Sequence, residues 1–276
     1  MTEKSVTEKN MRSDWLSESL FSGDVAFITG AGSGINQGIA QMFAAHGAKV
    51  VIVGRRQEKL DETCELIRKA GGEAMGISAD VRDLEAMSAA AEQGAKAYGP
   101  YTLVVAGAAG NFMAPFDKIS SNGFSSVVDI DLKGTFHTLK AASAHFAESN
   151  VRCLAITAPQ SQMAMPMQSH VCAAKAGVDM LIKTLSLEWG RKGVRINALS
   201  PGFVEGTVGG DLVSAGQGDN IKRLLPLNRF ASVKEMAQMA TVMVSPLTAY
   251  LTGQVVALDG GISLLGPAGM MGAAGG

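Results

Sequence analysis

The stretch TGAGSGINQGIA, residues 29–40, decides the fold of this chain. It follows the apolar run DVAFIT (24–29) and leads into a segment with the apolar spacing of a helix. Its glycines permit a tight turn and a close approach of the backbone to a pyrophosphate, while the helix N-terminus offers free N–H groups. A glycine-rich loop between a strand and a helix therefore predicts a dinucleotide site. The residues that we expect around the phosphates are Gly30, Ser33, Gly34 and Ile35.

Apolar runs rich in β-branched residues continue along the chain and alternate with longer segments of helical period. Besides 24–29, the runs that indicate strands are 49–54, 73–78, 101–107, 151–157, 194–200 and 254–260. Continuous apolar strands separated by helices imply a parallel sheet that is covered on both faces. We therefore predict one doubly wound Rossmann-type α/β domain, with a seven-stranded parallel sheet flanked by helices, over residues 21–265.

Composition excludes several classes of function. A formal net charge of -1 on 276 residues gives no excess of positive charge that would favour binding to nucleic acid or to an acidic membrane surface. The polar start MTEKSVTEKN lacks the apolar core of a signal peptide, and no apolar run approaches the ~18 residues of a membrane span. The three cysteines and four histidines show no metal-ligand spacing. We expect a cytoplasmic protein with no metal, no nucleic acid and no membrane partner.

Three segments fall outside the regular alternation. Residues 1–20 are predicted to be a frayed lead-in, and the glycine-rich residues 266–276 a flexible tail. Residues 203–225 lie between a strand and the next helix, at the carboxyl edge of the expected sheet. A connection of that length at this edge is typical of a mobile substrate lid.

The second strand ends in GRR (54–56), without the acidic residue that usually binds the ribose hydroxyls of NAD. Arg55 and Arg56 instead suit an additional ribose phosphate, because guanidinium binds phosphate in a planar fork. The alternative is a solvated pair of charges at a helix start. The pattern favours NADPH as the cofactor.

The glycine spacing resembles the TGxxxGxG motif of the short-chain dehydrogenase/reductase family, and the resemblance extends over about residues 22–262. Asn36 stands where the family has its third glycine. ADV (79–81) resembles the turn that contacts adenine, and PGFVEGT (201–207) resembles the loop that closes over the nicotinamide. LDGG (258–261) resembles the last strand of the family. The cofactor-binding residues that this resemblance implies are Asp80, Val81, Lys175, Pro201, Gly202 and Thr207.

The active site of that family combines serine, tyrosine, lysine and asparagine, and only the lysine is kept, as Lys175. Val171 stands at the tyrosine position, Ala158 at the serine position and Asp131 at the asparagine position. Ala106 replaces the first asparagine of the family's NNAG motif. A carbonyl reductase that uses tyrosine as its acid is therefore not implied.

One branch of the family also lacks the tyrosine and the serine. AAGNF (108–112), DIDLKGTF (129–136), the H-x-x-x-A-K of residues 170–175 and EWG (188–190) resemble 2,4-dienoyl-CoA reductases, especially the peroxisomal type. This resemblance implies NADPH-dependent reduction of a conjugated dienoyl thioester to a 3-enoyl thioester. It also implies a homotetramer, built through helices expected at about 113–148 and 170–190 that are rich in small residues.

The chemistry explains why the tyrosine is dispensable. Reduction of a dienoyl thioester places charge on the thioester oxygen, where fixed hydrogen-bond donors can hold it. Lys175 would hold the nicotinamide ribose, and Asp131 would orient that lysine or relay a proton, unless the two form only a structural salt bridge. The residues expected to meet the acyl-CoA substrate are Asn111, Phe112 and Arg82; Phe112 could equally be core, and Arg82 a solvated charge.

Two other functions remain open. The same fold could reduce another activated alkene or a carbonyl compound. Alternatively, the chain could be a catalytically inactive NADP-binding sensor or partner protein, as the replacements at 36, 106, 158 and 171 would allow. The retained Lys175 and the AAGNF motif favour an enzyme.

Overall fold

The computed structural model describes residues 16–207 and 218–265. Seven parallel strands form one sheet in the order β3-β2-β1-β4-β5-β6-β7, which confirms the predicted Rossmann-type fold. The strands are β1 (Val25–Thr29), β2 (Lys49–Gly54), β3 (Glu73–Ser78), β4 (Leu103–Ala106), β5 (Arg152–Ile156), β6 (Arg195–Pro201) and β7 (Val255–Leu258). Each lies within, or one residue beyond, the run from which it was predicted.

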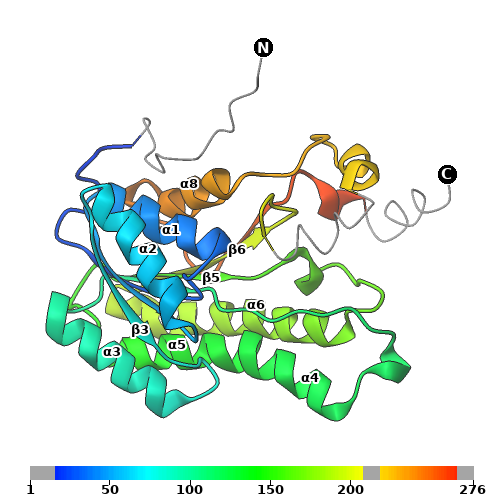
Figure 1. Cartoon of the computed structure of the whole chain (residues 1–276), viewed down its shortest axis with the longest axis horizontal. Helices are drawn as coiled ribbons and strands as arrows, with labels where there is room; N and C mark the ends of the chain where they lie inside the picture. Colours follow the sequence, from blue (N-terminus) through cyan, green and yellow to red (C-terminus); the bar gives the residue numbers. More distant parts are fainter. Residues whose placement is uncertain (1–15, 208–217, 266–276) are drawn as a thin grey trace.

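Helices cover both faces of this sheet (Figure 1). One layer contains α1 (Gly34–Ala45), α2 (Gln57–Lys69) and α8 (Val233–Val244), and residues 218–224 are also helical. The opposite layer contains α3 (Leu84–Tyr98), α4 (Ser121–Val128), α5 (Gly134–Ser143) and α6 (Ser169–Trp189). Short helical turns are η1 (Phe116–Lys118), η2 (Asp129–Lys133), η3 (Pro159–Ser161), η4 (Gly190–Lys192), η5 (Pro246–Thr248) and η6 (Ile262–Leu264).

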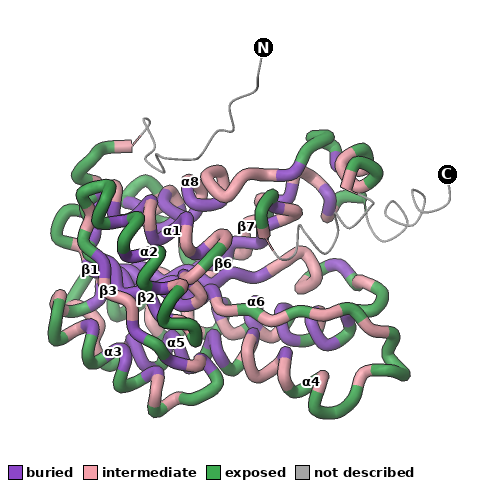
Figure 2. Tube along the Cα trace, viewed as in Figure 1, coloured by how far each residue is buried: buried purple, intermediate pink, exposed green. Residues whose placement is uncertain are grey.

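The two apolar clusters correspond to these two layers. One joins Phe43 of α1 and Met243 of α8 to one face of the sheet. The other joins Met87 of α3 and Ile182 of α6 to the opposite face. The central strands are buried along their whole length, as Figure 2 shows in purple. This burial on both faces is why the strands are continuously apolar rather than alternating.

The region expected to form one helix at about 113–148 is divided. α4 begins at an N-cap where the Ser120 hydroxyl accepts a hydrogen bond from the Gly123 N–H at 3.0 Å. It passes through the π-helical turn η2 before α5 continues the same rod. π-turns inside helices occur often at functional sites, and this turn carries Asp131.

The order of strands reverses between β1 and β4, which pair in parallel with Ile28 opposite Val105. Ligands of doubly wound sheets bind outside the carboxyl ends of the strands at this switch point. The glycine-rich loop follows β1 and the AAGNF loop follows β4, so both predicted site segments lie there.

The predicted lid at 203–225 lies partly outside the described residues. Its flanks, 203–207 and 218–225, are described and are connected by a Glu205–Lys222 ion pair at 3.6 Å. The predicted tail, 266–276, and residues 1–15 of the predicted lead-in lie outside the described part of the chain.

Candidate active site

The loop after β1 forms a cradle whose first glycine has no room for a side chain. Gly30 has a φ of +73°, and a Cβ there would lie 2.9 Å from the backbone of Ala108. Gly34 has a φ of +62° and opens α1. The Ser33 side chain makes no capping hydrogen bond, so the first N–H groups of α1 remain available to an anion. Ile35 follows in the first turn, half-buried.

This cradle fits a nicotinamide dinucleotide. The helix end is positive and is not capped by a side chain of its own, which suits a pyrophosphate. Thr207, from the loop after β6, lies over the cradle: a Cβ at Gly34 would be 3.6 Å from its Cγ2. Pro201 ends β6 and Gly202 follows, where a Cβ would lie 2.6 Å from Asp259. The two predicted cofactor loops therefore meet at the same edge of the sheet.

Asn36 fits at the position of the family's third glycine because the residue opposite it, on the loop after β4, is also a glycine and leaves room for the asparagine side chain. Its Nδ2 donates to the Gly107 carbonyl at 2.7 Å. A Cβ at Gly107 would lie 2.2 to 2.5 Å from the Asn36 side chain. The pair joins the helix of the cradle to the loop after β4.

Lys175 and Asp131 form a buried ion pair at 3.2 Å, with side chains 6% and 1% exposed. Lys175 Nζ also donates to the Ile156 carbonyl at 3.1 Å. The other Asp131 oxygen accepts from the Gly110 N–H at 2.7 Å. One carboxylate thus fixes both the lysine of α6 and the loop after β4, as buried charges require.

Apolar side chains stand at the positions of the family's tyrosine and serine. Val171 is buried in a small cluster with Val127 and Ala174, against which Phe112 packs. Ala158 begins the turn η3 and is half-buried. Neither side chain can donate a proton or a hydrogen bond, so in this structure the lysine is accompanied by a carboxylate rather than by a tyrosine.

The AAGNF loop is fixed against α6 by two further residues. His170 is fully buried, its Nε2 lies 3.1 Å from the Phe112 carbonyl, and the two rings are 4.3 Å apart. The Gln168 side chain donates to Asn111 Oδ1 at 3.2 Å. Asn111 and Phe112 are thereby brought beside the first turn of α6.

The second region predicted to bind the cofactor lies at the ends of β2 and β3. Arg55 and Arg56 are both exposed there. Asp80 accepts hydrogen bonds from Arg82, the shortest being 2.6 Å, and these bonds hold the pKa of its carboxyl below the usual range. Val81 is buried, 2.7 Å from where a Cβ of Gly134 would stand. The sequence did not predict that Asp80 and Arg82 engage each other.

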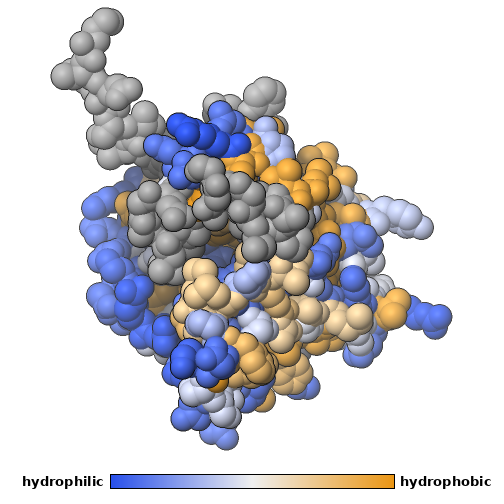
Figure 3. Space-filling view, turned by 90° about the vertical axis from the view of Figure 1, so that its right-hand side faces the viewer, coloured by the Kyte–Doolittle hydropathy of each residue, from blue (hydrophilic) through white to orange (hydrophobic). Residues whose placement is uncertain are grey.

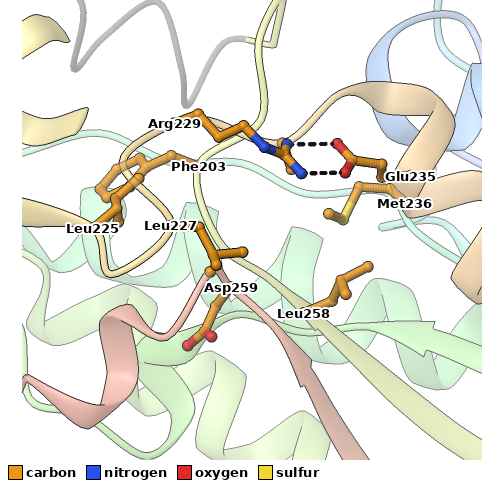
Figure 4. Close-up of a pocket in the computed structure, with 10 residues that line it drawn as sticks. Phe203, Leu225, Leu227, Arg229, Glu235, Met236, Leu258 and Asp259 are labelled. Atoms are coloured by element: carbon orange, nitrogen blue, oxygen red, sulfur yellow. Dashed lines mark hydrogen bonds and ion pairs between the residues drawn. The ribbon is translucent and has the colours of Figure 1, made fainter. Parts of the chain in front are cut away.

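A separate hollow lies beside the loop after β6, between β7 and the start of α8 (Figure 4). Its walls include Phe203 and Leu258, and Arg229 and Glu235 point toward each other at its rim. Arg229 donates two bonds, of 2.9 and 2.6 Å, to Glu235 and lowers the pKa of that carboxyl to about 2. None of the lining residues contributes to the Lys175 site.

Over the described ranges, no cluster of three or more His, Cys, Asp or Glu side chains is arranged to hold a metal ion. Within the same part of the chain, no helix is both long and apolar enough to cross a membrane.

The amide side chains around Asn111 were missed from the sequence. Gln160 donates to Gln168 at 2.9 Å, and Gln168 donates to Asn111. Glutamines carry no spacing signal, and nothing in the sequence shows that these two side chains meet Asn111.

Comparisons with known proteins agree with this geometry. A family profile described as Enoyl-(Acyl carrier protein) reductase matches residues 30–263. The chain is 37% identical to the peroxisomal 2,4-dienoyl-CoA reductase of Saccharomyces cerevisiae, over 95% of this chain and 90% of that protein. It is 36% identical to the peroxisomal 2,4-dienoyl-CoA reductase of Rattus norvegicus, over 86% and 82% of the two chains.

The chain belongs to the short-chain dehydrogenase/reductase family. A solved short chain dehydrogenase from Bacillus anthracis superposes with a TM-score of 0.79 at 34% identity, covering 87% of this chain and 96% of that one. Membership of this family implies an oxidoreductase that uses a nicotinamide cofactor, and the glycine-rich cradle after β1 agrees with such a cofactor. The resemblance drawn from the motifs is thereby confirmed.

Proposed function

We propose that this short-chain reductase uses NADPH to reduce a conjugated enoyl thioester, with a 2,4-dienoyl-CoA as substrate and a 3-enoyl-CoA as product. One observation carries the proposal: Lys175 is paired with Asp131 in a site where Val171 and Ala158 remove both hydroxyl donors. The relatives that bear the name 2,4-dienoyl-CoA reductase support the substrate class.

When bound at the cradle, the cofactor supplies a hydride, whose addition to the far end of the dienoyl group leaves negative charge on the thioester oxygen. Lys175 would bind the nicotinamide ribose and keep the site electropositive, which favours that charge. Asp131 would orient Lys175 and hold the loop through Gly110. No alkoxide forms in this reaction, so no tyrosine acid is needed beside the substrate carbonyl. The α-carbon of the dienolate takes up a proton afterwards, from water or a positioned acid, to give the 3-enoyl thioester.

NADPH is proposed over NADH because Arg55 and Arg56 are exposed at the end of β2, where an additional ribose phosphate would meet them. Asp80 would bind the adenine, and Arg82, which it holds, would face phosphates of the substrate CoA. Titration of both reduced cofactors by fluorescence tests this preference. Replacement of Arg55 by alanine should lower the affinity for NADPH and leave the affinity for NADH unchanged. Equal affinities for the two cofactors in the wild type would refute the preference.

A homotetramer and a cytoplasmic location complete the proposal. Several large apolar side chains on α4, α5 and α6 are exposed: Phe124, Phe136, Met180 and Leu187. Helices that expose such side chains suit contacts with a second copy of the chain. Cell fractionation tests the location, since the two relatives compared above are named peroxisomal.

The experiment that tests the function follows NADPH absorbance with 2,4-hexadienoyl-CoA as substrate. Turnover of this thioester with negligible reduction of simple ketones supports the proposal. Ready reduction of ketones would favour a different activated substrate, and NADPH binding without turnover of any substrate would favour a sensor protein.

A further inference from the structure

The segment that leads into α6 lies against the loop after β4 and brings two methionines together. The Ala114 N–H donates to the Met167 carbonyl at 3.0 Å. Beside this bond, the Gln168 side chain donates to Asn111 at 3.2 Å. Met113 and Met167, which are distant in the sequence, therefore stand in adjoining segments next to the loop that carries the predicted substrate residues.

Both members of this methionine pair are open to solvent. Met113 is 53% exposed and Met167 is 44% exposed. Figure 3 shows further apolar side chains gathered toward this end of the molecule. Four other methionines are at most 1% exposed: Met42, Met87, Met236 and Met243. A reagent in solution can therefore reach the sulfur atoms of the pair but not those of these four buried residues.

Met167 is held in a backbone conformation that favours glycine. Its φ is +65°, in the left-handed region, where a long side chain is strained. Pro166 restricts the backbone before it, and the bond from Ala114 fixes its carbonyl. Strain of this kind is found preferentially at ligand sites and switch regions. The conformation of Met167 thus points to a role for this exposed side chain.

A thioether in this position can be oxidised by a hydroperoxide. The sulfur lone pair attacks one peroxide oxygen, so that an S–O bond forms while the O–O bond breaks. The sulfur loses two electrons and becomes a sulfoxide, and the peroxide is reduced to water or an alcohol. Thiol-dependent reductases return the sulfoxide to the thioether. Because the sulfoxide is polar, covering it with an apolar ligand costs free energy that the thioether does not cost.

We propose that Met113 and Met167 form a reversible oxidation site for hydroperoxides, and that their sulfoxides weaken the binding of the acyl-CoA. The inference rests on the proposed function, because it places the acyl group beside Phe112, the residue that precedes Met113. It adds regulation to that function. Oxidation of the pair would lower the affinity for the substrate and leave the Lys175 site and the glycine-rich cradle unchanged.

Graded treatment with hydrogen peroxide tests the site, followed by dithiothreitol to reduce sulfenic acids and disulfides of cysteine. Peptide mass spectrometry should find sulfoxide at Met113 and Met167 before any appears at a buried methionine such as Met87. The Kd for decadienoyl-CoA, measured by calorimetry with NADP⁺ present, should rise by about tenfold. The Kd for NADPH should not change. Methionine sulfoxide reductase should restore the original affinity for the acyl-CoA.

Two variants assign the effect to the pair. The double variant Met113→Leu with Met167→Leu keeps apolar side chains of similar volume that peroxide does not oxidise, so its Kd for decadienoyl-CoA should be the same before and after treatment. Met180→Leu is the matched control, because it removes another exposed methionine, on α6. It should lose affinity on oxidation as the wild type does. Sulfoxide at both positions without a change in Kd, or a double variant as sensitive as the wild type, overturns the inference.

The binding measurement separates this inference from the proposed function, because it needs no turnover. An acyl-CoA that binds less tightly after oxidation, in a protein that reduces no dienoyl-CoA, would refute the function and support the oxidation site. Normal reduction of dienoyl-CoA, with binding that does not respond to oxidation of the pair, would refute the oxidation site alone.

Discussion

Gly107→Ala tests whether the contact between the cofactor helix and the loop after β4 depends on a matched pair of residues. The new methyl group would stand 2.2 to 2.5 Å from the side-chain atoms of Asn36, well inside van der Waals distance. Asn36 is only 7% exposed and bonds the Gly107 carbonyl at 2.7 Å, so it cannot turn away without breaking that bond. The substitution therefore overpacks the site and removes a buried hydrogen bond together.

The size of the effect follows from these two terms. Overpacking of a dense core costs about 1–3 kcal/mol, and a buried polar group left without its partner costs about 1–3 kcal/mol. We expect Gly107→Ala to lower the free energy of unfolding by about 3 kcal/mol. For a chain of this size that corresponds to a fall in Tm of roughly 6 °C. Asn36→Gly alone should lower the free energy of unfolding by about 2 kcal/mol, because it removes the same hydrogen bond and places a glycine inside a helix.

The double variant, which combines Asn36→Gly with Gly107→Ala, decides the matter. Once the asparagine side chain is gone, the methyl group introduced at position 107 enters the vacated space, and the double variant should be more stable than Gly107→Ala alone. Thermal unfolding of all three variants without cofactor, at one protein concentration, measures this. Gly190→Ala is the matched control, because no atom lies within 4 Å of a Cβ there and its φ is -55°. A Gly107→Ala protein as stable as the wild type, or a double variant that loses the sum of both effects, would refute the reasoning.

Three further predictions concern the reaction, stability and assembly. Lys175→Ala should lose most turnover, and Asp131→Ala should lose less if it only orients the lysine, but as much if it relays a proton. Circular dichroism and thermal unfolding check that each variant folds, since breaking a buried pair costs ~3–5 kcal/mol. Arg229 depresses the pKa of Glu235 to about 2, so this carboxylate stabilises the fold above its ordinary pKa of 4.5, and the contribution disappears as the pH falls through about 2. Tm measured over this range should fall less steeply in Arg229→Gln, and parallel curves would contradict the assignment. Met180→Lys places a charge on a side chain that is 62% exposed, so sedimentation should show smaller species with unchanged secondary structure if α6 forms the tetramer.

The fold could be predicted almost completely from the sequence. Strands buried on both faces are continuously apolar, so β1, β4 and β5 are recognisable without any knowledge of their neighbours. The break between α4 and α5 could not be predicted. The π-helical turn at the break carries Asp131, and the partner of Asp131 is Lys175, which is distant in the sequence.

The site could be predicted in part. The Lys175–Asp131 pair followed from the family resemblance, and the structure places the two side chains in contact. The Asn36–Gly107 pair depends on two segments that meet only in the folded chain. The amide chain through Gln168 likewise depends on side-chain direction, which no periodicity encodes.

The central claim is that this site reduces a carbon–carbon double bond of a conjugated thioester without a tyrosine acid. Incubation of the wild-type protein with NADPH, 2,4-hexadienoyl-CoA and, separately, simple ketones tests it most directly. We predict that NADPH consumption matches the loss of the dienoyl thioester one for one, with hardly any reduction of ketones. Rapid ketone reduction with an unchanged dienoyl thioester would contradict the account.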